Sequence, residues 1–485
     1  MSAHKATDPR PHQPLAGDSF GDPVTTAKDH EEEDSKDADS KAVNKTKDDE
    51  EDSTAKESPV RRFLGSLGPG LVTGSADDDP SGIATYAQAG ATFSNGMLWT
   101  APATLPMMMA VQEICDRTAL ATGDSLGKLA RRKFSRKPRV VIAVLVIALL
   151  AANTLNAAAD LMAVGQGMEM LGAGPGHLWS AIAGIGVGAV LIAGGFGIIS
   201  KIFKWLCLGL LAYVAVLFVA NVDWSDIVAG LLGLQFRWSW DYLGLIVAVL
   251  GTTISPYLFF WQSEHRVEEL RGEDRGGDRA VGLQERSDRA AQRKLRAARA
   301  DTFVGMFFSV LVMFAIIAAT AATLGKNGTD VKTAADAAKA LEPVVGPAAK
   351  FLFAAGFIGS GILAVPVLAA AGSGGLAGLL GKEWGFDRRP SRAKTFYVLL
   401  GVGTIGGVII SFLVSDPIGL LIFSAIINGI AAAPFLVVTM LISRDKEIMG
   451  QYSNGKLAAT LGWATTVIMV FAGAIGIWTT LTGSS

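Results

Sequence analysis

Apolar stretches long enough to cross a lipid bilayer recur along this chain from residue 66 to residue 481. A transmembrane helix needs about 20 mostly apolar residues. Half of the residues are apolar and 56 are glycine, which allows helices in a membrane to approach closely. We therefore predict an all-α, multi-pass membrane protein. The eleven predicted spans are 66–91, 95–121, 140–171, 178–198, 203–222, 241–262, 302–324, 346–378, 395–415, 418–442 and 457–481.

Two of these spans, the first and the sixth, are interrupted by residues that break helices. The first contains Asp77-Asp78-Asp79-Pro80-Ser81-Gly82, and the sixth contains 251–256 with Pro256 at its end. A charge near the bilayer centre costs at least about 2.5–3.5 kcal/mol, and unwound backbone is tolerated there only where it is buried in protein or lines a watery cavity. Broken helices at matching positions of two inverted repeats surround the substrate in many transporters. Because the two breaks stand five spans apart, we predict a leucine-transporter-type fold with two inverted five-helix repeats plus an eleventh helix.

The distribution of charge predicts the domains and the orientation. Residues 1–58 carry 16 acidic and 8 basic side chains with few large apolar residues, so we expect a disordered acidic tail. Lys and Arg gather in the loops 131–139 and 382–394, on the same side of the membrane as Arg61-Arg62, while the opposite loops carry few. Positive charge marks the cytoplasmic side, so we predict a cytoplasmic N-terminus, an outside C-terminus and a bacterial inner membrane as the location.

The stretch 264–300 is the most highly charged part of the chain after the tail, with ten basic and eight acidic residues. We interpret it as a solvated cytoplasmic linker in preference to a helix on the membrane surface. The predicted organisation is the tail 1–58, the first repeat and the broken sixth span at 59–263, the linker 264–300, and the remaining spans at 301–485.

Several function classes lack support in the sequence. Cys115 and Cys207 form no CxxC or Cys/His spacing, and no nucleotide-binding or hydrolytic motif is present. We therefore expect neither an enzyme nor a resident cofactor, and no nucleic-acid partner; a monomer is compatible with the sequence. Glu113, Asp116 and Arg117 are interpreted as a surface charge cluster near the cytoplasmic end of the second span.

Short motifs spread over residues 63–480 resemble the natural resistance-associated macrophage protein family of divalent metal transporters. The family reads Asp-Pro-Gly-Asn, Ile-Ala-Thr and Gln-Ala-Gly-Ala in its first span. The corresponding residues here are 79–82, 83–85 and 88–91; further matches are Gly68-Pro69-Gly70, 121–126, Asp160-Leu161, Met449-Gly450 and Asn454.

By this resemblance, Asp79 is the metal-ligating carboxylate and Ala76 supplies a backbone carbonyl. The chain also departs from the family. Gly82 replaces the asparagine ligand, Ser255 replaces the methionine ligand, and Tyr257 replaces the histidine used in proton movement. Two acidic positions around Asp160 are Asn153 and Ala163, and the glutamine of span ten has only Ser424 or Asn428 nearby.

Replacing a thioether with a hydroxyl leaves oxygen donors, and losing an amide leaves extra space. Such a site fits a partly hydrated Mg²⁺ or Mn²⁺ better than Fe²⁺, so the chain resembles the magnesium-transporting branch of the family. Asp77 and Asp78 could add charge or bond free backbone amides, Ser255 and Thr252 could ligate or cap helix ends, and Asp160 could carry protons or pair with Asn156. The candidate ligands are Asp79, Ala76, Ser255, Thr252 and Asp78; the cavity residues are Asp77, Ser81, Gly82, Tyr257, Ser424 and Asn428; Asp160 is the proton-path candidate.

The predicted function is inward transport of Mg²⁺ or Mn²⁺ across the lipid bilayer by alternating access, with proton coupling in doubt. The alternatives are a proton-coupled Mn²⁺/Fe²⁺ symporter, a symporter of organic solutes on the same fold, and a membrane metal sensor without transport. Three acids at the break repel the carboxylate of an organic substrate, which disfavours the second alternative.

Overall fold

The breaks predicted in spans one and six separate pairs of half-helices in the computed structural model. Helix α3 (Pro69–Asp77) is followed by α4 (Pro80–Phe93), and α12 (Trp240–Thr253) is followed by α13 (Pro256–Gly272). Pro80 and Pro256 begin the second half-helices, because proline fits the first helical turn but removes a hydrogen bond further along. Both predicted breaks are confirmed.

The structure describes residues 69–193, 223–325 and 349–482, with a few single residues between these ranges, and they all belong to the unit 66–485. The predicted tail and most of the predicted fifth span lie outside them. The other long helices are α5 (Thr100–Thr122), α7 (Arg136–Met170), α8 (Gly176–Ile192), α14 (Asp288–Thr323), α17 (Ala349–Leu380), α18 (Lys394–Leu413), α19 (Pro417–Ser443) and α21 (Lys456–Thr482). The short ones are η2 (Ser94–Met97), α6 (Leu126–Lys133), α11 (Trp224–Leu231), η4 (Leu283–Glu285), α20 (Lys446–Met449) and η7 (Gly450–Tyr452).

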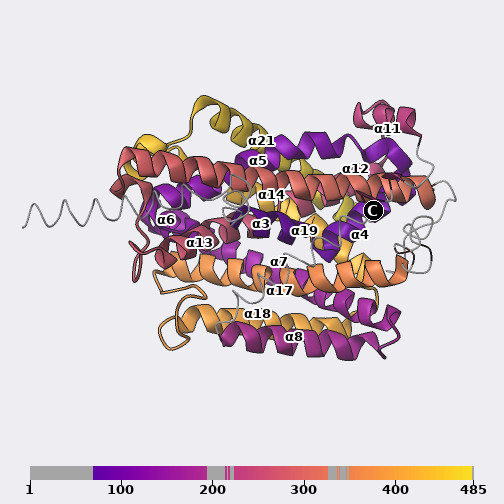
Figure 1. Cartoon of the computed structure of the whole chain (residues 1–485), viewed down its shortest axis with the longest axis horizontal. Helices are drawn as coiled ribbons and strands as arrows, with labels where there is room; N and C mark the ends of the chain where they lie inside the picture. Colours follow the sequence, from indigo (N-terminus) through magenta and orange to yellow (C-terminus); the bar gives the residue numbers. More distant parts are fainter. Residues whose placement is uncertain are drawn as a thin grey trace, which may run out of the picture. The chain divides into compact units, whose positions relative to one another are not determined.

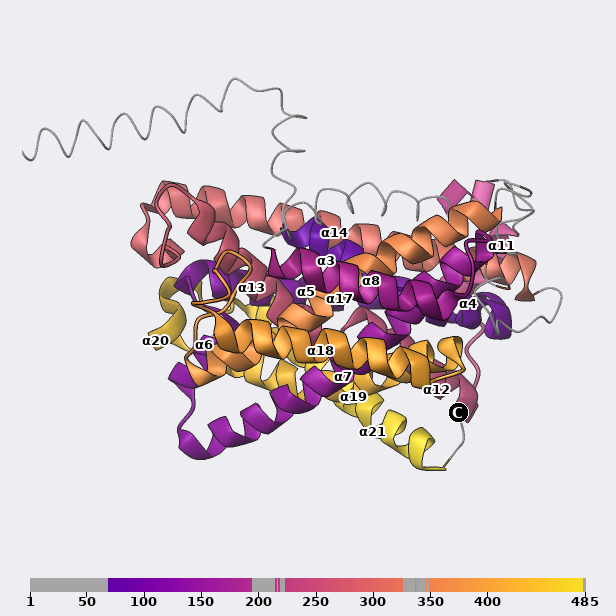
Figure 2. The same cartoon turned by 90° about the horizontal axis from the view of Figure 1, so that it is seen from below.

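The half-helices of the first broken span lie among long unbroken helices. Helix α14 packs along α3, α4 and α5, while α19 packs against α12, α21, α7 and α4 (Figure 1). Helix α7 packs against α17, α18 and α8, and α18 and α8 lie together on that side in both views (Figures 1 and 2). The residues around the first break are therefore enclosed by α7, α14 and α19.

Helices α3 and α14 touch backbone to backbone. A Cβ atom added to Gly74 would lie 2.1 Å from the carbonyl oxygen of Gly305, which is far inside van der Waals contact. The two chains can approach this closely because neither position carries a side chain, as is common between membrane helices. Glycine at position 74 therefore sets the distance between the first half-helix and α14.

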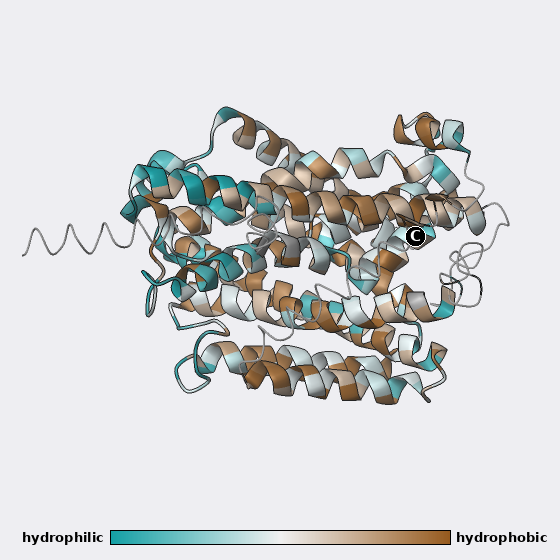
Figure 3. Ribbon diagram, in the orientation of Figure 1, coloured by the Kyte–Doolittle hydropathy of each residue, from teal (hydrophilic) through white to brown (hydrophobic). Residues whose placement is uncertain are grey.

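Hydrophilic residues gather at one end of the helices, which we call the charged end: α6 together with residues 264–300 and 382–394 (Figure 3). The segment interpreted as a linker is largely helical, because residues 264–272 continue α13 and residues 288–300 begin α14. Ion pairs join Asp278 of this segment to Arg388 and Arg392 of the loop 382–394. The hydrogen bond from Arg388, together with the charge of Arg392, lowers the pKa of Asp278 below its usual range. The charged end is thus a folded, ion-paired layer.

Candidate functional site

The carboxylate of Asp79 lies at the break between α3 and α4 and caps the first turn of α4. Its backbone is extended, with φ −70° and ψ 170°. Oδ1 accepts hydrogen bonds from the Gly82 amide at 2.8 Å and from the Ser81 hydroxyl at 2.5 Å. A carboxylate at a helix N-terminus is stabilised by the free amides and by the helix dipole. The sequence Asp-Pro-Ser-Gly therefore holds one oxygen of the buried carboxylate in place by local contacts.

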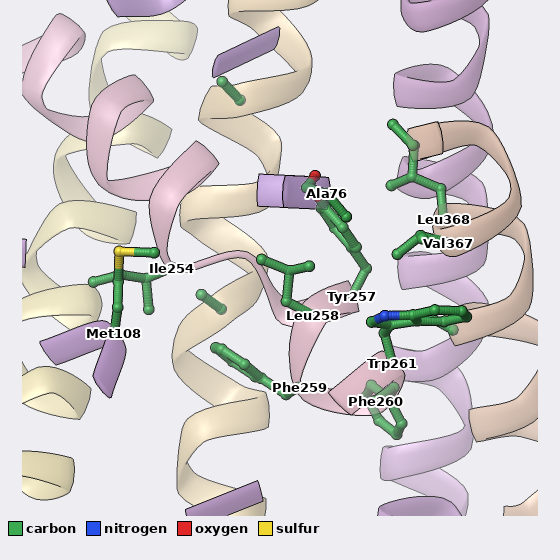
Figure 4. Close-up of a cluster of buried hydrophobic side chains, with 14 of the residues drawn as sticks. Ala76, Met108, Ile254, Tyr257, Leu258, Phe259, Phe260, Trp261, Val367 and Leu368 are labelled. Atoms are coloured by element: carbon green, nitrogen blue, oxygen red, sulfur yellow. The ribbon is translucent and has the colours of Figure 1, made fainter. Parts of the chain in front are cut away.

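The second oxygen of Asp79 faces two other helices. Oδ2 accepts from the Asn156 side-chain amide in α7 and from the Tyr257 hydroxyl in α13, each at 3.2 Å. The Tyr257 hydroxyl also lies 3.4 Å from the carbonyl oxygen of Ala76, and Figure 4 shows its ring reaching toward that residue. All these side chains are buried. The predicted ligand, the predicted carbonyl and the second broken span therefore meet at one point.

Of the other predicted residues in the second half of the chain, some bond to residues that contact Asp79 and others do not. The Thr252 hydroxyl is 3.3 Å from that of Ser81, and the Ser424 hydroxyl donates to the Asn156 carbonyl oxygen at 2.7 Å. The Ser255 hydroxyl instead lies 2.7 Å from the Gly251 carbonyl and 2.8 Å from that of Thr252, at the end of its own half-helix. Asn428 is buried, and its amide has no hydrogen-bond partner among the described residues.

Asp77 and Asp78 point toward α14 rather than toward Tyr257. The Ser309 hydroxyl lies 2.5 Å from Asp77 Oδ2 and 3.3 Å from Asp78 Oδ1. Asp77 Oδ1 and Asp78 Oδ2 are buried with no hydrogen-bond partner in the described part of the chain. Across those same residues, no group of three or more His, Cys, Asp or Glu side chains is arranged to hold one metal ion. A cation at Asp79 would therefore depend on carbonyl, hydroxyl and amide oxygens beside one carboxylate.

The sequence predicted extra space beside Gly82, and this prediction is wrong. A Cβ atom there would lie 3.2 Å from the Asp77 carbonyl oxygen, and 3.3 Å from both the Thr252 hydroxyl and the ring of Tyr86. Tyr86 and Thr252 fill the volume that a larger residue at position 82 would occupy. The change to glycine removes an amide donor without leaving a cavity beside it.

Asp160 lies in α7 one turn after Asn156, and its side chain is fully buried. Neither of its carboxylate oxygens has a hydrogen-bond partner within the described ranges. The alternative pairing with Asn156 is not observed, because that amide bonds to Asp79 and Ser424 instead. The role of Asp160 in a proton path stays a prediction.

Two residues of the site, Asn156 and Ser309, were not predicted as part of it. Each is a polar side chain within a membrane-spanning helix, and that was the available signal, since a polar group buried in a membrane protein needs a partner. Sequence alone does not say which face of α7 or α14 turns toward the break.

A second buried polar cluster lies where α3 meets the charged end. The Arg266 guanidinium contacts the two Asp116 carboxylate oxygens at 2.6 and 3.1 Å and the Asp301 carboxylate at 3.5 Å. Asp301 in turn accepts from the Gly70 amide at 2.7 Å. Asp116 and Arg117 are 2% and 4% exposed, so their interpretation as a surface cluster is wrong: Gln262 and Arg266 bind Asp116, and Arg117 bonds to the Tyr452 carbonyl and to Asn454. This cluster ties α3 to α5, α13 and α14.

We expect Ser309→Ala to destabilise the protein by about 1–3 kcal/mol, because it leaves the buried carboxylate of Asp77 without its hydrogen-bond donor. Thermal unfolding of the purified protein in detergent measures the change. Ser411→Ala is the matched control, since that buried hydroxyl donates to the Val408 carbonyl of its own helix and faces no acid. Equal effects of the two substitutions would contradict the prediction.

Comparison with known proteins identifies relatives along almost the whole described chain. A family model described as natural resistance-associated macrophage protein-like matches residues 70–479. The divalent metal cation transporter MntH 1 of Pseudomonas aeruginosa is 27% identical over 429 residues, covering 84% of this chain and 90% of that protein. The divalent metal cation transporter MntH of Deinococcus radiodurans is 24% identical over 443 residues, covering 87% and 92%.

A solved structure shares the fold. The manganese transporter of Eremococcus coleocola, in complex with an aromatic bis-isothiourea substituted compound, has a TM-score of 0.67 and 17% identity, covering 87% of this chain and 88% of that one. This likeness confirms the predicted leucine-transporter-type, all-α membrane fold. The names of these relatives refer to divalent metals or manganese, so they support the family but not its magnesium-transporting branch.

Proposed function

Because the chain belongs to the natural resistance-associated macrophage protein family, we propose that it carries a divalent metal cation across the membrane, with Asp79 as the central ligand. It is an integral multi-pass membrane protein of a transporter family and not an enzyme. The observation that carries the proposal is the position of Asp79: a buried carboxylate at the break of one half-helix pair, touched by Tyr257 from the other. Unwound backbone and half-helix ends at such a break bind substrate in inverted-repeat transporters.

The groups around Asp79 favour a hard cation. The hydroxyl groups of Ser81 and Tyr257 and the carbonyl of Ala76 place oxygen atoms beside the carboxylate, whereas the Gly82 and Asn156 amides donate hydrogen to it. Carboxylate and carbonyl oxygens suit Mg²⁺, Ca²⁺ and Mn²⁺. The solved relative is named a manganese transporter, and we propose Mn²⁺ as the main substrate. Mg²⁺ is the second candidate, supported by the oxygen-rich surroundings.

Transport would proceed by alternating access, since Asp79 and its contacts are closed off from both ends in this conformation. We place the charged end in the cytoplasm, following the positive-inside rule. An inside-negative potential of 100 mV then favours entry of a divalent ion by about 4.6 kcal/mol, or roughly a 10³-fold gradient. Coupling to protons would add to this; Asp160 is the candidate carrier because its buried carboxylate has no hydrogen-bond partner in the described structure.

Uptake into vesicles tests the proposal. Purified protein in sealed liposomes, with a metal-sensitive dye and a pH dye inside, should admit Mn²⁺ faster than protein-free vesicles do, and faster still under an inside-negative potential. External Mg²⁺ in excess should compete. Influx of neither metal, together with retained Mn²⁺ binding, would contradict transport and leave the metal-sensor alternative. Acidification of the interior during uptake would support the proton-coupled form.

A further inference from the structure

Asn156 joins Asp79 to α19 through a hydrogen-bond chain that runs between three helices. Its amide nitrogen donates to Asp79 Oδ2 at 3.2 Å, and its amide oxygen accepts from the Ser424 hydroxyl at 2.7 Å. Asn156 and Ser424 are at most 1% exposed. The amide therefore presents hydrogen to the carboxylate oxygen that faces Tyr257, which is where a cation would bind.

The serine at the far end of this chain can serve either orientation of the amide. The Ser424 hydroxyl has one hydrogen but two acceptors in reach, the Asn156 oxygen at 2.7 Å and the Leu421 carbonyl at 2.8 Å. When the hydroxyl donates to Leu421, its lone pairs are free to accept. A rotation of the Asn156 amide by about 180° then lets its NH₂ group donate to Ser424, so the amide and the hydroxyl stay bonded to each other while Asp79 Oδ2 loses the amide donor.

The other donor to the same oxygen also has a second acceptor in reach. The Tyr257 hydroxyl is 3.2 Å from Asp79 Oδ2 and 3.4 Å from the Ala76 carbonyl oxygen. The oxygen Oδ1 stays bound to Ser81 and Gly82 at the start of α4. Asp79 can thus release both donors from Oδ2 without losing the contacts that hold the carboxylate in place.

We propose that Asn156 is a metal ligand: on cation binding its amide rotates, and its oxygen replaces its NH₂ group beside Asp79. This inference rests on the proposed function and adds a ligand from α7 to it. In the orientation described above, the amide hydrogens bond to the carboxylate. The loaded site gains a neutral oxygen of the kind that Mn²⁺ and Mg²⁺ accept.

Substitutions at Asn156 separate a ligand from a residue that only positions Asp79. Asn156→Leu removes both the oxygen that would ligate the metal and the NH₂ group that donates to Asp79. We expect Mn²⁺ affinity to fall about 10–100-fold. Asn156→Asp keeps an oxygen and removes the donor, so a ligand role predicts affinity equal to or above that of the wild type, with slower release and slower uptake. A role limited to positioning Asp79 predicts instead that Asp weakens binding as much as Leu does, because both variants remove the donor that holds Asp79 Oδ2.

Isothermal titration of the full-length protein in detergent with MnCl₂ measures affinity independently of transport. Asn153→Asp is the matched control: Asn153 is buried in the same helix one turn away, and its amide donates to the Leu368 carbonyl. This control measures the effect of an added carboxylate that is not a ligand, and we expect it to raise Mn²⁺ affinity less than Asn156→Asp does. Mn²⁺ binding by Asn156→Asp as weak as that of Asn156→Leu would overturn the proposal.

If Asn156→Leu does not fold, a second pair of variants tests the hydrogen-bond chain from Asp79 through Asn156 to Ser424. Ser424→Ala removes the partner that both amide orientations use, while Ser424→Thr retains a hydroxyl; we expect about tenfold weaker Mn²⁺ binding for Ala than for Thr. Equal affinities would contradict the inference. Its failure is distinguishable from that of the proposed function, which fails if the wild type neither binds nor carries Mn²⁺.

Discussion

Asp79→Asn is expected to abolish Mn²⁺ uptake into vesicles and to weaken Mn²⁺ binding about 10³-fold. A carboxylate at a protein site attracts a unit charge 4 Å away by about 4 kcal/mol and a divalent ion by about twice that; the 10³-fold loss corresponds to the smaller of these two values, since 1.4 kcal/mol is a factor of ten. Asparagine is also a favourable residue at a helix N-terminus. The capping bonds from Gly82 and Ser81 can persist, so the fold should survive the substitution.

Asp416→Asn is the control for this experiment. Asp416 caps α19 by accepting from the Gly419 amide at 3.0 Å, in an exposed position at the start of that helix. Both variants replace an aspartate that caps a helix with asparagine, but the charge of Asp416 lies away from the break between α3 and α4. Normal Mn²⁺ uptake by Asp79→Asn, or an equal loss in the control, would contradict Asp79 as the central ligand.

Arg266→Met is expected to lower the free energy of unfolding by about 3–5 kcal/mol, because it leaves the buried carboxylates of Asp116 and Asp301 without their shared cation. Methionine fills much of the same volume, so the loss comes mainly from the charge. Thermal unfolding in detergent, followed by tryptophan fluorescence, measures the effect. Since Asp301 also holds the Gly70 amide, we expect protease sensitivity near the start of α3 to rise as well.

Arg299→Met is the corresponding control for the second prediction. Arg299 is half-exposed, with 55% of its side chain accessible, and pairs with Glu113 at 2.9 Å. An ion pair in contact with solvent contributes about 0–1 kcal/mol. A loss of stability in Arg266→Met no larger than in Arg299→Met would show that the buried cluster does not hold these helices together.

The sequence was sufficient to predict Asp79 as the candidate ligand, because a carboxylate followed by proline at a break is costly in a membrane without a function and because the family resemblance singles it out among three aspartates; its role as ligand stays a prediction. It was also sufficient for the two broken spans, whose boundaries follow from Pro80 and Pro256. It was not sufficient for the partners of Asp79. Tyr257 was expected to line the cavity, and its hydroxyl in fact donates to Asp79; that contact depends on how α13 sits beside α3.

The errors share a physical cause, which is that burial depends on what a distant segment covers. Asp116 lies near the end of α5, where an isolated helix would be solvated, but Arg266 and residues 264–300 enclose it. Gly82 was expected to leave space, but the ring of Tyr86, one turn further along α4, occupies it. Asp77, the last residue of α3, and Asp78 both face Ser309 of α14, whereas Asp79 is bonded to Tyr257 of α13, and the sequence does not show which helix each acid faces.

The backbone contact between Gly74 and Gly305 restricts the direction of any motion of the first half-helix. Helix α3 cannot move closer to α14, since no side chain lies between them to compress. It can only slide along α14 or separate from it, and separation would open a path beside Asp77, Asp78 and Ser309. Spin labels on the two helices would therefore report distances that equal or exceed the present one throughout the transport cycle, never shorter ones.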